Sequence, residues 1–245
     1  MNQTHTTENT PHPPAVRTED VWKVFEQEPE DVQAVRGVTL SIEPGDFVAM
    51  AGPSGSGKTT LLNVIGGLTR PTRGAVWVAG HDVTKMSNRE LARMRLRHVG
   101  FVFQAYNLLP VLTALENAEF PMLLQGIEEG ERSRRVRQLF DRTGLEGLED
   151  RRPGKLSGGQ QQRVAVIRAV AGMPALVLAD EPTANLDSVA SDQLLEMMEE
   201  LNHGLGTTFV FATHDPKVME RSHRLIRLVD GATASDERRD PHPAP

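Results

Sequence analysis

The stretch FVAMAGPSGSGKTT, residues 47–60, joins an apolar run to a glycine-rich turn that ends in a lysine. Residues 52–59 fit the pattern G-x-x-x-x-G-K-[ST], and residues 60–65 continue as a plausible helix. The glycines let backbone N–H groups surround an anion at a helix N-terminus, which carries about half a positive charge. The expected phosphate cradle consists of Gly52, Pro53, Ser54, Gly55, Ser56, Gly57, Lys58, Thr59 and Thr60.

Two side chains of this cradle carry specific chemistry. Lys58 is expected to reach the β- and γ-phosphates of a nucleotide, and Thr59 to offer its hydroxyl to Mg²⁺. The strand before the motif and the helix after it are the context in which such loops bind phosphate. The motif therefore predicts phosphate binding, although kinases, GTPases, helicases and transport ATPases all share it.

Two further runs, residues 175–179 (ALVLA) and 208–212 (TFVFA), are wholly apolar like residues 47–51. Such runs are typical of parallel strands buried on both faces. We also expect strands at 34–42 and 75–79, and a mostly helical region at 87–172 with helices at 88–96, 114–124, 128–143 and 159–171. The pattern predicts an α/β fold whose chemistry lies at the carboxyl ends of the strands.

Two carboxylates, Asp180 and Glu181, follow the run 175–179 and so lie at the carboxyl end of a predicted strand. Beside the cradle, Asp180 would hold Mg²⁺ through a water, while Glu181, one residue on and facing the other way, would polarise an attacking water. His214 follows the run 208–212 in the same way and would bridge the γ-phosphate and Glu181. The alternatives are acids solvated at a strand end and a structural histidine.

A second anion-receiving helix start lies at residues 156–160, LSGGQ. Ser157 is placed at or near the N-cap of a helix that continues with apolar residues at helical spacing. The segment contains no lysine equivalent to Lys58. Two loops so far apart in the sequence can bind one nucleotide only if the structure brings them together around it. Taken alone, the segment is equally a well-capped helix that starts with two glycines.

In this order the motifs closely resemble those of the ATP-binding subunits of ABC transporters, over about residues 17–230. GPSGSGKT resembles the family's Walker A, LSGGQ its signature, LVLADEP its Walker B with the catalytic glutamate, residues 184–187 its D-loop and THD its H-switch. Gln104 stands at the Q-loop position, and Phe25 at that of an adenine-stacking aromatic residue, most often Tyr. The resemblance implies a P-loop NTPase with a RecA-like core, an antiparallel β subdomain and a helical subdomain inserted at about 105–170.

The resemblance also implies roles and partners. Catalysis would rest on Glu181, His214 and Gln104, and Mg²⁺ would be held by Thr59, Gln104 and Asp180. In a homodimer, ATP would lie between the cradle of one copy and, from the other copy, Ser157, Gly158, Gly159, Gln160 and Asp187. Residues 99–117 look like those of lipoprotein-releasing, macrolide-exporting and cell-division mechanotransmission ATPases, which drive a separate transmembrane permease; its coupling helix would dock at 106–110.

Composition limits the remaining classes. The chain has 245 residues, a net charge of −6 and no cysteine, which excludes disulfide scaffolds, thiol nucleophiles and Cys-ligated metal sites. The acidic balance argues against nucleic-acid binding, and the N-terminus lacks the pattern of a secretory signal. We expect one ATPase domain at 16–230 between unfolded tails at 1–15 and 231–245, bound peripherally at the cytoplasmic face of the inner membrane.

The sequence also argues against two other functions. A soluble ABC ATPase of DNA repair or translation normally has two cassettes, a long heptad insertion or a basic face, and this sequence has one cassette, no sustained heptads and a net charge of −6. A phosphotransferase or GTPase would have no role for LSGGQ, and the sequence contains no N-K-x-D guanine motif.

Overall fold

The computed structural model describes residues 13–26 and 28–239, which form two sheets with helices around them. The antiparallel sheet has the order β2 (Val32–Ile42), β1 (Val16–Phe25), β4 (Arg73–Val78), β5 (His81–Asp82). The central sheet has the order β10 (Ala232–Arg238), β9 (Arg224–Val229), β3 (Phe47–Ala51), β8 (Thr208–Thr213), β7 (Leu176–Asp180), β6 (Val99–Phe103). Its strands are parallel except β10, which pairs antiparallel with β9 at one edge.

The central sheet is buried on both faces. Val48 and Met50 of β3 lie in a core shared with the antiparallel sheet and with α1 (Lys58–Ile65). Phe47 and Ala49 of the same strand lie in a second core, beneath the helices of the opposite face. Because successive side chains of a strand point to opposite faces, a strand covered on both sides must be apolar at every position, which explains the apolar runs of the sequence.

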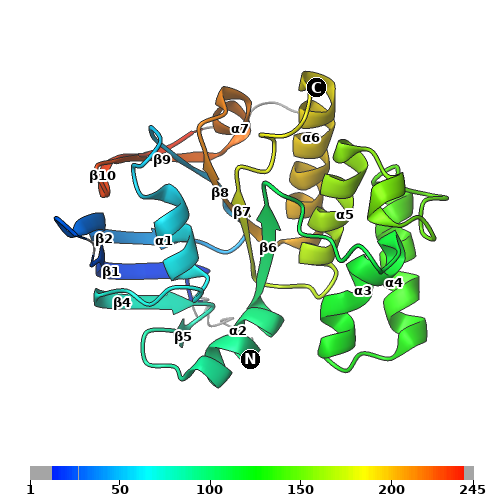
Figure 1. The fold of residues 1–245 in the computed structure, drawn as a ribbon, viewed down its shortest axis with the longest axis horizontal. Helices are drawn as coiled ribbons and strands as arrows, with labels where there is room; N and C mark the ends of the chain where they lie inside the picture. Colours follow the sequence, from blue (N-terminus) through cyan, green and yellow to red (C-terminus); the bar gives the residue numbers. More distant parts are fainter. Residues whose placement is uncertain (1–12, 27, 240–245) are drawn as a thin grey trace, which may run out of the picture.

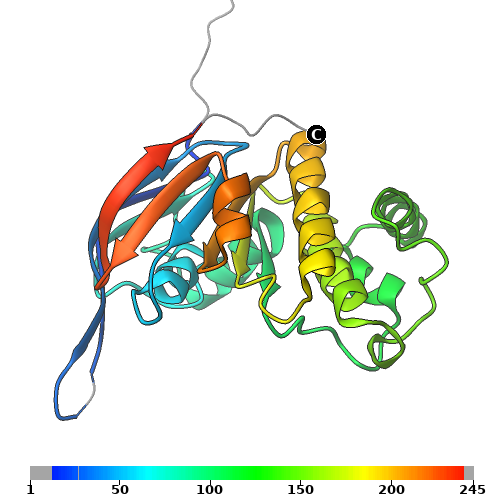
Figure 2. The same ribbon diagram turned by 90° about the horizontal axis from the view of Figure 1, so that it is seen from above.

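The helices divide between the two faces (Figure 1). α1 and α2 (Asn88–His98) contribute to the core on the side of the antiparallel sheet, whereas α5 (Gly158–Val170), α6 (Ser188–Leu205) and α7 (Pro216–Arg221) contribute to the opposite core. Between β6 and α5 in the chain lie three more elements: α3 (Ala114–Leu124), α4 (Glu129–Arg142) and the 3-10 turn at Pro153–Lys155. Figure 2 shows α4 at the opposite end of the molecule from the β1–β2 hairpin.

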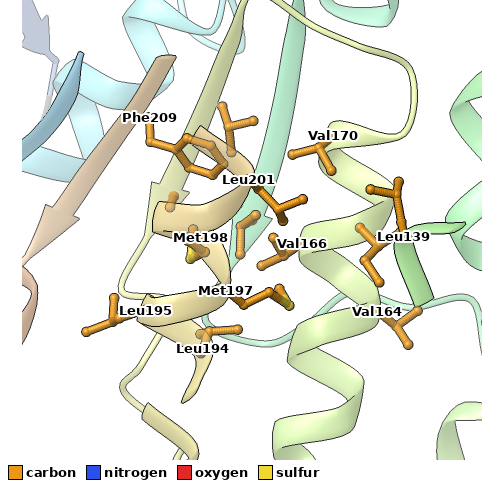
Figure 3. Close-up of a cluster of buried hydrophobic side chains, with 14 of the residues drawn as sticks. Leu139, Val164, Val166, Val170, Leu194, Leu195, Met197, Met198, Leu201 and Phe209 are labelled. Atoms are coloured by element: carbon orange, nitrogen blue, oxygen red, sulfur yellow. The ribbon is translucent and has the colours of Figure 1, made fainter. Parts of the chain in front are cut away.

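Helix α5 is fixed by apolar side chains along its length. Val164, Val166 and Val170 are fully buried or nearly so. Figure 3 shows Val166 and Met197 between α5 and α6, with Leu201 next to them. The first turns of α5 are therefore attached to a helix body that packs against α6 and the sheet.

Most predicted elements are present, the region 87–172 is mostly helical as predicted, and one prediction is wrong. The strand at 47–51 and the helix at 114–124 have the predicted bounds. Residues 231–245 do not all form an unfolded tail, because β10 pairs with β9, and the region 87–172 contains a parallel strand, β6. The predicted N-terminal tail lies mostly outside the described residues, but Ala15 is buried and its carbonyl accepts a hydrogen bond from the Ala79 N–H at 3.0 Å.

Candidate functional site

The phosphate loop between β3 and α1 is wedged against two other strands. A Cβ on Gly57, whose φ is +93°, would lie 2.1 Å from the carbonyl oxygen of Ala34 in β2. A Cβ on Gly52 would lie 2.2 Å from the carbonyl oxygen of Leu228 in β9. Only glycine fits at these two positions, so the close approach of the loop to both sheets depends on them.

The loop presents hydrogen-bond donors suited to a phosphate. Ser56 is 2% exposed, and its Oγ has no hydrogen-bond partner among the described residues. Lys58 Nζ donates to the carbonyl oxygens of Gly52 at 2.8 Å and of Pro53 at 2.9 Å, which holds the ammonium over the loop. α1 begins at Lys58 without a side-chain cap, so its first N–H groups are free to bind an anion. The cradle predicted from sequence therefore fits a phosphate group.

The loop opens into a cavity of about 1020 Å³, which is large enough for a nucleotide. Gln104, Glu181 and His214, from three separate segments of the chain, line it together with the loop. Arg36 and Asp230, which sequence analysis did not single out, also line the cavity. The fold thus gathers at one place side chains that the sequence scatters over more than half of its length.

Asp180, the last residue of β7, lies beside the loop. Its Oδ1 accepts a hydrogen bond from Thr59 Oγ1 at 2.8 Å. Burial raises the pKa of Asp180, and the nearby charge of Glu181 raises it further. No group of three or more His, Cys, Asp or Glu side chains in the described part of the chain could hold a metal ion. A hydroxyl beside one carboxylate instead fits Mg²⁺, which keeps waters and takes its other ligands from substrate phosphates.

Glu181 leaves the strand by a left-handed turn, with φ at +47°. Its N–H donates to the carbonyl oxygen of Ala212 in the neighbouring strand β8 at 2.9 Å. Its carboxylate lies 2.7 Å from His214 Nδ1 and accepts a hydrogen bond from Thr213 Oγ1 at 3.2 Å. Backbone and side-chain contacts with β8 thus fix the direction of this carboxylate.

Gln104 lies at the end of β6 and contacts the segment after Glu181. Its Nε2 lies 3.5 Å from Asn185 Oδ1, and Asn185 Nδ2 donates to the Gln104 carbonyl oxygen at 2.9 Å. Sequence analysis did not identify Asn185 or Thr213 as functional. Both stand inside quoted motifs, ANLD and THD, but a motif does not state which of its members contact the site.

The other predicted site residues lie elsewhere. Ser157 caps α5 and shares a capping box with Gln160, with bonds of 2.9 and 3.2 Å, and Asp187 caps α6 through the Ala190 N–H at 2.8 Å. Phe25 is 43% exposed, so it is no core residue, and Lys23 Nζ lies 4.8 Å from its ring centre. Among the described residues, the cavity lining includes none of Phe25, Ser157, Gly158, Gly159, Gln160 and Asp187.

The family model described as ABC transporter matches residues 35–184, which include the phosphate loop, Gln104, LSGGQ and Glu181. The chain belongs to the ABC transporter family. It is the ATP-binding subunit type of that family, a cassette that binds and hydrolyses ATP.

Named relatives cover nearly the whole chain. An ABC transporter ATP-binding protein of Thermotoga maritima is 47% identical over 90% of this chain and 94% of its own length. A lipoprotein-releasing system ATP-binding protein LolD of Ruegeria pomeroyi is 46% identical over 91% of this chain and 98% of its own. A macrolide export ATP-binding/permease protein MacB of Bordetella avium is 43% identical over 94% of this chain but only 35% of its own.

A solved structure supports the fold directly. The dimeric, post-hydrolysis ATP-binding cassette MJ0796 with bound ADP and Pi is 39% identical, with a TM-score of 0.84 over 93% of this chain and all of that one. The predicted α/β fold of a P-loop NTPase is confirmed. Among the residues that the structure describes, no helix has the length and hydropathy to span a membrane.

Proposed function

We propose that this cassette hydrolyses Mg²⁺-ATP between two copies of itself, assembled head to tail, and drives a separate transmembrane permease at the cytoplasmic face of the inner membrane. The observation that carries the proposal is the division of the site. The phosphate loop, the uncapped start of α1, Glu181 and His214 line the cavity, whereas none of the LSGGQ residues at the start of α5 is among the described lining residues. A second copy would supply the missing half.

The dimer follows from this division. Ser157 and the N–H groups at the start of α5 form an anion-binding helix end that the chain's own nucleotide does not use. The relative MJ0796 has been solved as a dimer with ADP and Pi, which supports the same arrangement here. Closure would place this helix end on the γ-phosphate, so the closed state would require ATP and hydrolysis would release it.

Four of the predicted site residues have defined tasks in this mechanism. Lys58 would exchange its two bonds with loop carbonyls for the β- and γ-phosphate oxygens. Glu181 would orient the attacking water and accept its proton, and His214, 2.7 Å away, would hold that carboxylate in direction. Phe25, on the exposed β1–β2 hairpin, would offer its ring to adenine.

Mg²⁺ would be held by Thr59, Asp180 and Gln104. When bound, the ion neutralises charge that develops on the transferring phosphate. Thr59 Oγ1 lies 2.8 Å from Asp180 Oδ1, so the hydroxyl would bind the ion and the carboxylate would hold it through a water. Gln104 lines the same cavity and would add a third ligand when it leaves Asn185.

The permease would dock in a groove on another side of the cassette. The groove has a volume of about 420 Å³ and is lined by residues of α2, β6 and α3, among them Phe101 and Leu124, and by Leu68 and Asn107 from the segments after α1 and β6. Leu124 exposes more than half of its surface there, and exposed apolar side chains around a concave site usually mark a protein contact. The similarity to LolD and MacB supports a lipoprotein-releasing or macrolide-exporting type of system.

The first experiment compares Glu181→Gln with the wild type and with Glu200→Gln, a change at an exposed glutamate of α6. Glu181→Gln should bind ATP normally, hydrolyse it about 10²- to 10⁴-fold more slowly and elute with Mg²⁺-ATP at twice the mass of the 27.0 kDa chain. Glu200→Gln should match the wild type. Hydrolysis by Glu181→Gln at the wild-type rate would refute the assignment of the base.

The partner is tested in native membranes. Tagged Glu181→Gln, trapped with ATP, should co-purify with one membrane protein that carries a large extracytoplasmic domain. Introducing a charge by Leu124→Glu should abolish this association without changing the ATPase rate of the isolated cassette. A complex that survives this change would place the permease elsewhere, and recovery of soluble partners alone would favour a soluble ABC ATPase.

A further inference from the structure

A buried glutamine lies just behind the signature motif. Gln162 stands in the second turn of α5, five residues after the cap Ser157, and is 0% exposed. Glutamine is mostly found on protein surfaces, and a buried amide is stable only where its polar atoms are bonded. The contacts of this side chain therefore indicate why the chain keeps a polar group inside its core.

The amide of Gln162 reaches both catalytic segments of its own chain. Its Nε2 donates to the carbonyl oxygen of Pro182 at 2.8 Å, directly after Glu181. It also donates to the carbonyl oxygen of Phe103 at 3.3 Å, directly before Gln104. One nitrogen therefore ties α5 to the backbone beside the base and to the backbone beside the Q-loop glutamine.

The same amide is only half satisfied. Gln162 Oε1 is buried and has no hydrogen-bond partner among the described residues. A buried acceptor without a partner is unfavourable, so an apolar side chain of similar volume would suit folding better. The two donor bonds to the catalytic segments are the contacts that an apolar side chain could not make.

Helix α5 is one continuous helix from Gly158 to Val170. Its later turns carry the buried side chains of Val164, Val166 and Val170, and Figure 3 shows Val166 on the side of α6 and Val164 on the side of Leu139. Its first turn carries LSGGQ, in which the capping box bonds the N–H groups of Ser157 and Gln160 and takes up neither that of Gly158 nor that of Gly159. A force on the helix start therefore reaches Gln162 through one turn of hydrogen-bonded backbone.

We propose that Gln162 is a positioning residue that couples the LSGGQ helix to Glu181 and Gln104 of the same chain. A nucleotide on the phosphate loop of the partner copy would contact Ser157 and, through Gln162, fix the position of Glu181. The proposal rests on the dimer of the proposed function. Each copy then reports the occupancy of one site to the other. Gln162 acts through the backbone of Pro182 and Phe103 and does not touch ATP.

The test is Gln162→Met, which keeps the length of the side chain and removes both donors. The matched control is Gln161→Met, because Gln161 lies on the same helix but donates instead to the Leu156 carbonyl oxygen at 3.2 Å. Steady-state ATPase rates over a range of ATP concentrations give kcat, KM and the Hill coefficient. Equilibrium binding of a fluorescent ATP analogue and the melting temperature are measured in parallel.

Gln162→Met should lower kcat by about 10- to 100-fold, since a displacement of a catalytic group by about 1 Å costs up to that much. Binding of the ATP analogue should stay within about twofold of the wild type. The Hill coefficient, which can approach two for two coupled sites, should fall to about one. Gln161→Met should keep the wild-type Hill coefficient and kcat.

Three results separate this proposal from a structural role and from the proposed function. A wild-type Hill coefficient in Gln162→Met, or a loss of kcat that only follows a loss of folded protein, would overturn it. If Gln162→Met does not fold, Gln162→Asn replaces it. The shorter Asn side chain places its amide about 1.5 Å short of the two carbonyl oxygens, so we expect the same kinetics as for Gln162→Met. A wild-type cassette without ATP-dependent dimerisation would instead refute the dimer itself.

Discussion

A buried arginine of β9 bonds to the edge strand β10. A single substitution tests how much this contact contributes to the stability of the fold. Arg224 of β9 is 8% exposed, and its Nε and Nη2 donate to the two carboxylate oxygens of Asp236 in β10 at 2.7 and 2.6 Å. These hydrogen bonds raise the pKa of the Arg224 guanidinium. Asp236→Ala removes both bonds and leaves the cation in its pocket.

The expected loss of stability follows from the geometry. Removing one partner of a buried ion pair costs about 3–5 kcal/mol, because the other charge stays buried without compensation. The Asp236 side chain is 35% exposed, and the Asp46 carboxylate remains 3.7 Å from Arg224, so the loss should lie below that range, at about 2 kcal/mol. For a chain of this size, that corresponds to a decrease in Tm of about 4–8 °C.

Thermal and urea unfolding of the nucleotide-free protein measure this loss. Asp141→Ala, at an exposed position of α4, is the control and should change stability by less than about 0.5 kcal/mol. A chain that ends at residue 231 lacks β10 altogether and should be less stable than Asp236→Ala. Equal stability of Asp236→Ala, the truncated chain and the wild type would show that β10 does not hold β9 in place.

Two predictions concern the nucleotide site. The pKa of Asp180 is raised in the folded chain, so its ionisation opposes folding once the pH exceeds the pKa of the unfolded chain. Asp180→Asn should therefore raise the Tm of the nucleotide-free protein at pH 8 but not at pH 4, and it should abolish Mg²⁺-dependent hydrolysis. A lower Tm of the variant at pH 8 would contradict this sign. Gly57→Ala should abolish ATP binding and destabilise the chain by about 3 kcal/mol, because its Cβ would meet a backbone oxygen at 2.1 Å. Gly55→Ala, with open space around it, should cost only about 1 kcal/mol of backbone strain. Equal losses of stability in calorimetry would refute the steric argument.

The sequence predicted three of the five parallel strands, β3, β7 and β8, because each of them is apolar at nearly every position. Residues 47–51 are apolar at all positions and form β3 as expected. β10 was missed because ATASDER is polar and mostly exposed, and it is a strand through its pairing with β9 and the Arg224–Asp236 contact. β6 was missed because it starts where α2 ends, without a turn residue between them.

The site was predictable as a set of residues but not as a set of contacts. Motif order placed Lys58, Glu181 and His214 together, and the cavity contains all three. Nothing in the sequence indicated that Asn185 contacts Gln104 or that Gln162 bonds to Pro182, since these bonds join segments far apart in the chain. Motifs identify the chemistry, whereas the fold determines which backbone groups hold it in place.

The backbone at Glu181 shows how the fold departs from simple strand geometry to build this site. In β7, Val177 and Ala179 point to the core beneath α5 and α6, and Leu178 to the opposite core. A continued strand would send Glu181 to the side of Val177, under those helices. A positive φ of +47° instead directs its carboxylate to His214 in the cavity, at a strain of about 1–3 kcal/mol that the Ala212 and Thr213 hydrogen bonds offset. In the proposed mechanism, strain at this one residue would allow Asp180 to hold the metal and Glu181 to orient the water.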